Sequence, residues 1–88
     1  MTDHQKLWIG GRVRQYRRSR GLTQQLLATE IEARGPVTVD QSTVSNWERG
    51  RAEISLRYRR PLADALGVPV DILFEDPPAG WQPTRTAA

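Results

Sequence analysis

The stretch DQSTVSNWERG, residues 40–50, has the start and stop signals of a short helix. Asp40 is a favoured N-cap residue, and Gly50 is a favoured residue just after a helix C-terminus. Between them only Val44 and Trp47 are strongly apolar. A helix that only filled a bundle would have about three apolar positions in every two turns, so this helix buries little and displays mostly polar side chains.

On a helical wheel of about 100° per residue, Val44 and Trp47 form one narrow apolar stripe. The remaining surface carries hydrogen-bonding side chains, which are Gln41, Ser42, Ser45, Asn46 and Arg49. Short donors and acceptors on the first turns of a helix suit insertion into the major groove of DNA. An ordinary surface helix is the competing interpretation of this segment.

Glu48 flanks the apolar stripe, so its carboxylate is expected to turn toward the body of the domain. A partly buried carboxylate needs a charged partner or several hydrogen-bond donors. Arg17, one residue beyond Tyr16 on the first predicted helix, is placed to pair with it. The alternative is a solvent-facing Glu48 without a particular partner.

The first periodic segment, residues 6–21, carries one apolar stripe. Its members recur at helical spacing and are Ile9, Val13 and Tyr16. Gly10 and Gly11 each cost about 1 kcal/mol inside a helix. The first turns are therefore either frayed or built so that another backbone can come close.

Thr23 is the predicted N-cap of a second helix over residues 24–34. The next residues, GPVTV at 35–39, cannot continue this helix, because Pro36 follows Gly35 and β-branched residues come next. A non-helical connection therefore leads to the helix that begins after Asp40.

A fourth helix is predicted over residues 56–66, between a Ser55 cap and Gly67. Pro61 requires this helix either to start late or to be kinked. Residues 70–76, VDILFED, form one more short apolar helical segment. Its side chains either cap the core or form a homodimer surface.

The chain as a whole predicts an all-α fold, a compact five-helix bundle in one domain over residues 7–76. Residues 1–6 are expected to form an N-terminal arm, and residues 77–88 have the composition of a disordered, flexible tail. No apolar run approaches the ~18 residues of a membrane span, and no signal-peptide pattern follows the start. A cytoplasmic protein without a membrane partner is expected.

The distribution of charge indicates a polyanionic partner. Residues 1–60 carry twelve Lys and Arg against six Asp and Glu, which gives +6, and residues 61–88 carry one against four, which gives −3. Twelve of the thirteen basic residues are Arg, whose planar guanidinium suits phosphate and guanine.

Without cysteine, and with only His4 near the amino end, the chain predicts no metal site, no cofactor and no enzyme.

Three motifs together resemble the helix-turn-helix domain of phage-repressor-like regulators of Cro/C1 or XRE type. They are IGGRVRQYRRSRGLTQQLLA at 9–28, STVSNWERG at 42–50 and LADALGV at 62–68. The resemblance implies a fold of the lambda-repressor-like DNA-binding type, in which the second and third helices form the helix-turn-helix. It implies a bacterial or phage-encoded, nucleoid-associated transcriptional regulator, a repressor, that binds double-stranded DNA sequence-specifically with residues 41–49 as recognition helix.

The resemblance also implies roles for single residues. Arg17 and Glu48 occupy the interhelical ion-pair positions, in agreement with the geometric argument above. The base-reading positions are Gln41, Ser42 and Asn46, with Ser45 nearby on the same surface. The expected contacts to the DNA backbone come from Thr23, Gln24, Arg49 and Arg51, to which the basic surface adds Arg12, Arg14 and Arg57. One such helix reads few base pairs, so a homodimer on half-sites about 10 bp apart is expected.

The chain departs from the family pattern in two places. The connection between the second and third helices is about six residues longer, so residues 33–39 either tilt the recognition helix or touch DNA through Arg34. Arg59 stands where the family places an apolar residue, and Pro61 where a helix interior is expected. A late start of the fourth helix would create a phosphate-facing cluster of Arg57, Arg59 and Arg60.

The main alternative function is an antitoxin or adaptor whose principal task is to bind a protein partner. Its interface would then be the apolar VDILF segment, residues 70–74, together with the tail. The arginine-rich first helix and the polar third helix favour DNA over this alternative.

Overall fold

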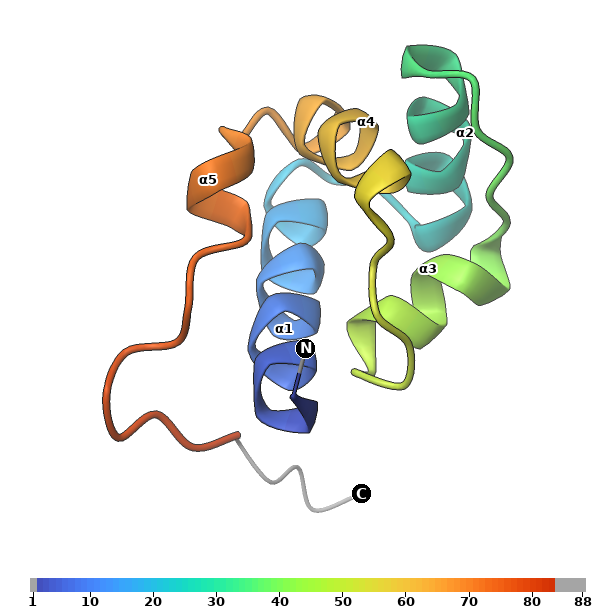
Figure 1. The fold of residues 1–88 in the computed structure, drawn as a ribbon. Helices are drawn as coiled ribbons and strands as arrows, with labels where there is room; N and C mark the ends of the chain where they lie inside the picture. The colour runs from blue at the N-terminus through green and yellow to red at the C-terminus, as the bar shows by residue number, and fades with distance from the viewer. Residues whose placement is uncertain (1, 84–88) are drawn as a thin grey trace.

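The computed structural model describes residues 2–83, and this part of the chain forms five helices and no strand. The helices are α1 (Asp3–Ser19), α2 (Gln24–Arg34), α3 (Gln41–Glu48), α4 (Leu56–Leu66) and α5 (Val70–Leu73). α1 packs mainly against α3, and α2 packs against α4 and α3, so that one core lies between them (Figure 1). The predicted all-α five-helix bundle is confirmed.

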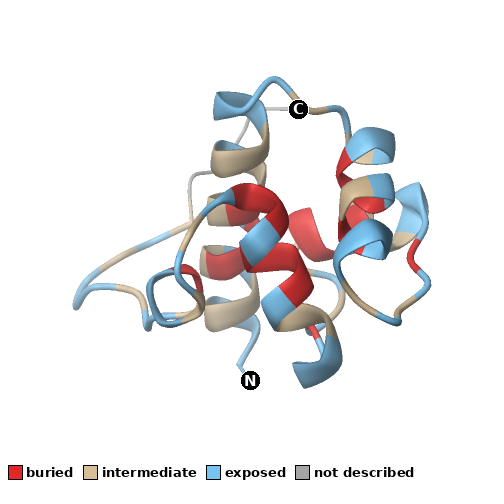
Figure 2. Cartoon of the chain, turned by 90° about the horizontal axis from the view of Figure 1, so that it is seen from above, coloured by how far each residue is buried: buried red, intermediate tan, exposed pale blue. Residues whose placement is uncertain are grey.

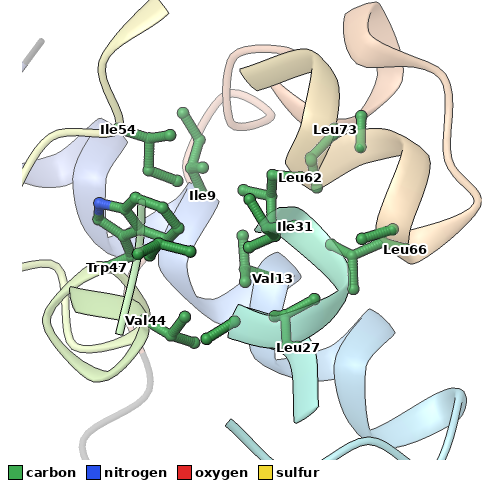
Figure 3. Packing of buried hydrophobic residues seen from close by; sticks show 14 residues of the cluster. Ile9, Val13, Leu27, Ile31, Val44, Trp47, Ile54, Leu62, Leu66 and Leu73 are labelled. Atoms are coloured by element: carbon green, nitrogen blue, oxygen red, sulfur yellow. The ribbon is translucent and has the colours of Figure 1, made fainter. Parts of the chain in front are cut away.

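The side chains of α1, α2, α3, α4 and α5 meet in a single hydrophobic core (Figure 3). The largest fully buried side chains are Leu27, Ile31, Leu62, Leu66, Leu73, Val13 and Val44. Burial of each such aliphatic side chain contributes about 1.5–3 kcal/mol. Buried residues lie on the inner sides of the helices and exposed residues on the outer sides (Figure 2), which is the amphipathic pattern that the sequence predicts.

Side-chain caps set the starts of α2 and α3 where the sequence predicts them. Thr23 Oγ1 accepts a hydrogen bond from the backbone N–H of Leu26 at 3.0 Å, and Asp40 Oδ1 accepts one from that of Thr43 at 2.9 Å. Gly50 follows α3 with a φ of 70°, a conformation that ends the helix and favours glycine.

α1 begins at Asp3, so residues 3–6 form its first turn instead of an N-terminal arm. A capping box explains the early start. Thr2 Oγ1 accepts a hydrogen bond from Gln5 N at 3.1 Å, and Gln5 Oε1 accepts one from Thr2 N at 2.9 Å. The amide group of Gln5 also donates to Asp76 Oδ1 at 3.0 Å, which ties this turn to the segment after α5.

α4 begins at Leu56 with Pro61 inside it, so the late start is wrong. Ser55 precedes the helix without a side-chain cap hydrogen bond. Pro61 is buried and packs against Gly35 at the end of α2, where an added Cβ would lie 2.8 Å from the Pro61 ring. The proline therefore belongs to the contact between α2 and α4.

Arg59 does not join a phosphate-facing cluster, because its side chain packs between α4 and α5. Its Nε donates to the carbonyl oxygen of Ile54 at 3.2 Å, and its guanidinium lies 4.8 Å from the centroid of the Phe74 ring. Arg57 and Arg60 stay exposed. An arginine at a position where the family places an apolar residue is thus accommodated by a carbonyl and an aromatic ring.

The short helix α5 contributes Leu73 to the core, with no exposed surface. Val70 and Phe74 are half-buried against the same core. Ile72 is 41% exposed and points away from it. The apolar VDILF segment therefore caps the core with some of its side chains and leaves one large apolar side chain outside.

The lengthened connection, residues 35–40, is fastened to the helices on both sides. Val39 is buried in the core, and its backbone N–H donates to Glu32 Oε2 at 3.0 Å. The hydroxyl of Tyr58 donates to the carbonyl oxygen of Thr38 at 3.1 Å. The connection is thus part of the packed domain and links α2, α3 and α4.

Gly10 allows the backbones of α1 and α3 to touch. A Cβ at this position would lie 2.3 Å from the carbonyl oxygen of Trp47 and 2.9 Å from that of Glu48. Gly11 differs, because no atom lies within 4 Å of a Cβ placed there. Of the two explanations for the paired glycines, close approach of another backbone therefore holds for Gly10.

The two glycines predict opposite effects of the same substitution. Gly10→Ala should destabilise the fold by about 3 kcal/mol, because the methyl group must push α3 away. Gly11→Ala should stabilise it by about 0.5–1 kcal/mol, because alanine is the better helix former and meets no neighbour. Urea denaturation followed by circular dichroism measures both. Equal midpoints for the two variants would contradict the proposed contact.

Candidate nucleic-acid interface

Glu48, at the end of α3, is buried and pairs with Arg17 of α1. The carboxylate side chain has no exposed surface. Arg17 Nε lies 2.6 Å from Oε2 and Nη2 lies 3.0 Å from Oε1, a two-pronged arrangement that matches the fork of the guanidinium. The hydrogen bond with Glu48 raises the pKa of Arg17 above its ordinary value. The structure thus contains the ion pair that the sequence predicts.

Further donors surround the Glu48 carboxylate. Gln24 Nε2 donates to Oε1 at 3.2 Å, and Arg14 Nε lies 3.4 Å from the same oxygen. Arg17 in turn donates through Nη1 to the carbonyl oxygen of Leu22 at 2.9 Å. This network ties the end of α3 to α1 and to the start of α2, and it uses the Gln24 amide that the resemblance assigns to the DNA backbone.

The outer side of α3 gathers the predicted base-reading residues on one surface. An open hollow there is lined by Gln24, Gln41, Ser42, Ser45, Asn46 and Arg49. Val44 and Trp47 on the inner side are buried in the core. α3 therefore has one side fixed to the domain and one polar side directed outward, as its sequence pattern indicates.

Asp40 places a negative charge at the amino end of α3. Hydrogen bonds from the backbone N–H and the hydroxyl of Thr43 lower the pKa of its carboxyl group. The stabilisation from this cap is complete above the ordinary range of a carboxyl pKa and is lost as the pH falls through the lowered value. Asp40 is exposed, so this charge faces solvent beside Gln41.

Three of the arginines predicted to contact the DNA backbone follow α3 in the sequence and are exposed. They are Arg49, Arg51 and Arg57. Within residues 2–83 none of the three forms an ion pair, although Arg57 stacks 5.1 Å from the ring centroid of its neighbour Tyr58. Their guanidinium groups are therefore available to an external anion.

Arg12 lies apart from these arginines and packs against α5. Its Nη2 donates to the carbonyl oxygen of Ile72 at 2.7 Å and lies 3.4 Å from Glu75 Oε1. Only 15% of the side chain is exposed. The expected backbone contact from Arg12 is thus not supported by its position, because α5 folds onto this side of α1.

Thr23 and Arg34 also have partners within the domain. Thr23 is exposed at the start of α2, where its hydroxyl caps the helix. Arg34 pairs with Glu30 on the same helix, with 2.6 Å between Nη1 and Oε2. Thr23 can still present its backbone to an anion at the helix start, whereas Arg34 is held along α2.

Sequence reasoning missed the second guanidinium at Glu48. Arg14 lies one turn before Arg17, and residues three apart occupy neighbouring places on a helix. That spacing could have indicated that Arg14 and Arg17 reach the same carboxylate.

Comparison with known proteins agrees with this geometry. Residues 13–73 match the model of a family described as helix-turn-helix. The chain belongs to this family, in its Cro/C1 or XRE type.

Two similar proteins can be named. One is an uncharacterized transcriptional regulator in the ATPase CF(0) region of Rhodospirillum rubrum, 37% identical over 73 residues, which are 83% of this chain and 62% of the relative. The chain thus spans less than two thirds of that relative. The other is the restriction-modification controller protein C.AhdI from Aeromonas hydrophila, whose crystal structure is 33% identical, with a TM-score of 0.68, over 78% of this chain and 96% of that one.

The Glu48 network of this helix-turn-helix domain predicts a large effect of Glu48→Ala. Loss of the carboxylate leaves Arg17 partly buried and unpaired, which should destabilise the fold by about 3–5 kcal/mol. Chemical denaturation measures the change, with Glu30→Ala as control, because Glu30 forms only an exposed pair within α2. A denaturation midpoint equal to that of the wild type would show that the network does not stabilise the fold.

Proposed function

We propose that this helix-turn-helix protein regulates transcription, as a repressor, by binding double-stranded DNA with α3 in the major groove. The observation that carries the proposal is the division of α3 into two sides. The inner side is held by Val44, Trp47 and the Glu48 network, and the outer side presents amide and hydroxyl groups that can read base edges.

Base reading is proposed for the residues that line the outer side of α3. Gln41 lies in the first turn and has the paired donor and acceptor that match adenine. Ser42, Ser45 and Asn46 follow on the same surface. Each good side-chain contact to a base contributes about 1–3 kcal/mol of discrimination.

Affinity is proposed to come from arginine contacts to phosphates. Arg49 and Arg51 follow α3 directly, and Arg57 lies in the first turn of α4. All three are exposed. Because such contacts release counterions, binding should weaken steeply as salt rises.

The named relatives support a regulatory role, since one is called a transcriptional regulator and the other a controller protein. A single recognition helix reads too few base pairs for a unique site, so we propose a homodimer on an inverted repeat.

None of the helices within residues 2–83 is long and apolar enough to cross a membrane. We place the regulator in the cytoplasm, on the nucleoid.

The experiment that tests this function is selection from a randomised duplex pool, with fluorescence anisotropy across a salt series. Enrichment of an inverted repeat and a steep salt dependence would support a dimeric sequence-specific regulator. Salt-dependent binding without enrichment would contradict sequence specificity. Absence of binding at low salt would contradict DNA binding itself and favour a protein partner.

The reading side of α3 predicts a specific loss in two variants. Gln41→Ala and Asn46→Ala should each reduce the preference for the selected site over random DNA by about tenfold. Binding to random DNA should stay nearly unchanged, because it rests on the arginines. Gln15→Ala removes the same kind of amide from an exposed position on α1 and serves as the matched control. Equal losses on selected and random DNA would show that another surface reads the bases.

A further inference from the structure

A second hollow lies where the end of α3 meets α1 and the C-terminal segment. Its lining includes Gly11, Arg14, Glu48, Arg49, Trp81 and Pro83. Residues 74–83, called the strap below, leave α5 and run back toward the amino end of α1 (Figure 1). The strap therefore forms one wall of a site that the helix-turn-helix alone would leave open.

Aromatic contacts and hydrogen bonds hold the strap on α1. The indole N–H of Trp8 donates to the carbonyl oxygen of Glu75 at 3.0 Å, next to the Gln5–Asp76 hydrogen bond described above. The Trp81 ring meets the rings of Trp8 and His4 edge to face, at centroid distances of 5.2 and 4.9 Å. Such aromatic pairs add to the stabilisation from simple burial, so Trp81 has a defined place beside the hollow.

The polar wall of the hollow carries excess positive charge. The Glu48 carboxylate accepts two hydrogen bonds from Arg17, whereas Arg14 donates to it through Nε alone. Within residues 2–83, the two terminal nitrogens of Arg14 form no bond to a carboxylate, and Arg49 forms no ion pair. Together with Arg17, which pairs with Glu48 but does not line the hollow, three guanidinium groups stand against one carboxylate and leave a charge of +2 around it, which suits an anion.

Gly11 lines the hollow, and the packing of the domain gives no reason for a glycine at this position. It is an exposed residue inside α1, where glycine weakens a helix. Unlike Gly10, it faces no atom that a Cβ would meet within 4 Å. A glycine also permits close approach of a ligand to the backbone, and Gly11 lines the hollow together with Arg14 and Trp81.

We propose that this hollow is a phosphate-binding site completed by the strap, and that its occupant is a phosphodiester of the DNA backbone. The proposal rests on the proposed function, because α3 in the major groove brings a backbone close to its own C-terminal end. Arg14 and Arg49 donate to the phosphate, and the Trp81 ring limits the access of water on the other side, which strengthens these charged hydrogen bonds. A free nucleotide carries the same phosphate chemistry and is the other source that the test distinguishes.

The test compares Arg14→Ala and Trp81→Ala with the wild type on the selected duplex and on a random duplex. Arg14→Ala should bind both about tenfold more weakly, and its salt slope should fall by about one. Trp81→Ala should also weaken binding to both duplexes, whereas Trp81→Phe, which keeps an aromatic ring, should bind them like the wild type. Arg18→Ala, on α1 but outside this lining, is the equal-charge control and should change binding less than twofold.

Chemical denaturation of every variant separates a binding effect from a folding effect. Gly11→Leu adds a second readout, because its Cβ would meet no atom within 4 Å and its longer side chain would enter the hollow that Gly11 lines. It should fold at least as stably as the wild type and bind DNA about tenfold more weakly. If Trp81→Ala and Gly11→Leu bind DNA as tightly as the wild type, the proposal is overturned. This holds even if the wild-type protein selects an inverted repeat, in which case the proposed function stands.

Two further experiments distinguish a phosphodiester of the DNA backbone from a free phosphate as the occupant of the hollow. Duplexes that carry a neutral methylphosphonate at one position at a time should reveal a phosphate to which the wild type is sensitive and Arg14→Ala is not. The same sensitivity in both proteins would overturn the assignment of that phosphate to the hollow.

Tryptophan fluorescence during titration with inorganic phosphate or thymidine monophosphate tests the other source. Saturable binding there, with duplex binding unaffected by Arg14→Ala, would overturn the DNA backbone as occupant, whereas a wild type that binds no duplex would overturn the proposed function itself.

Discussion

The Glu48 carboxylate lies between α1 and α3 without exposed surface, and the position of α3 depends on how this charge is satisfied. Removal of a carboxylate and a guanidinium from water costs several kcal/mol per ion, even after the protein relaxes. The two-pronged bond from Arg17 and the amide of Gln24 offset that cost only in one arrangement of the helices. The net stabilisation is therefore modest, and the larger consequence is that α3 has a defined orientation.

A defined orientation matters because α3 has so little apolar surface. Val44 and Trp47 supply its buried apolar side chains, and two such residues allow rotation and sliding more readily than a broad stripe would. Gly10 adds the complementary constraint, since the α1 backbone lies directly against the carbonyl groups of Trp47 and Glu48. The close backbone contact and the buried ion pair therefore fix α3 against α1 at two neighbouring points. The polar outer side of α3 then remains open to solvent.

Local chemistry explains which parts of this architecture the sequence predicts. The extent of α2, the caps at Thr23 and Asp40 and the Arg17–Glu48 pair follow from helix signals and from the cost of an unpaired charge. The uses of Arg12 and Arg59 do not follow, because both depend on where α5 comes to rest. An exposed arginine and one held by a distant carbonyl look the same in a sequence.

The C-terminal segment shows the same limit. Proline, glycine and polar residues predict a disordered tail over 77–88, and composition carries no information on the partner of one tryptophan. The structure places Trp81 against Trp8 and His4, while residues 84–88 of the expected tail lie outside the described part. The longer connection between α2 and α3 is better explained in energetic terms, because Val39 enters the core and Thr38 accepts a hydrogen bond from Tyr58. Since the Glu48 network fixes one end of α3 and this connection fixes the other, the additional residues lengthen the link between α2 and α3 without releasing α3 from the domain.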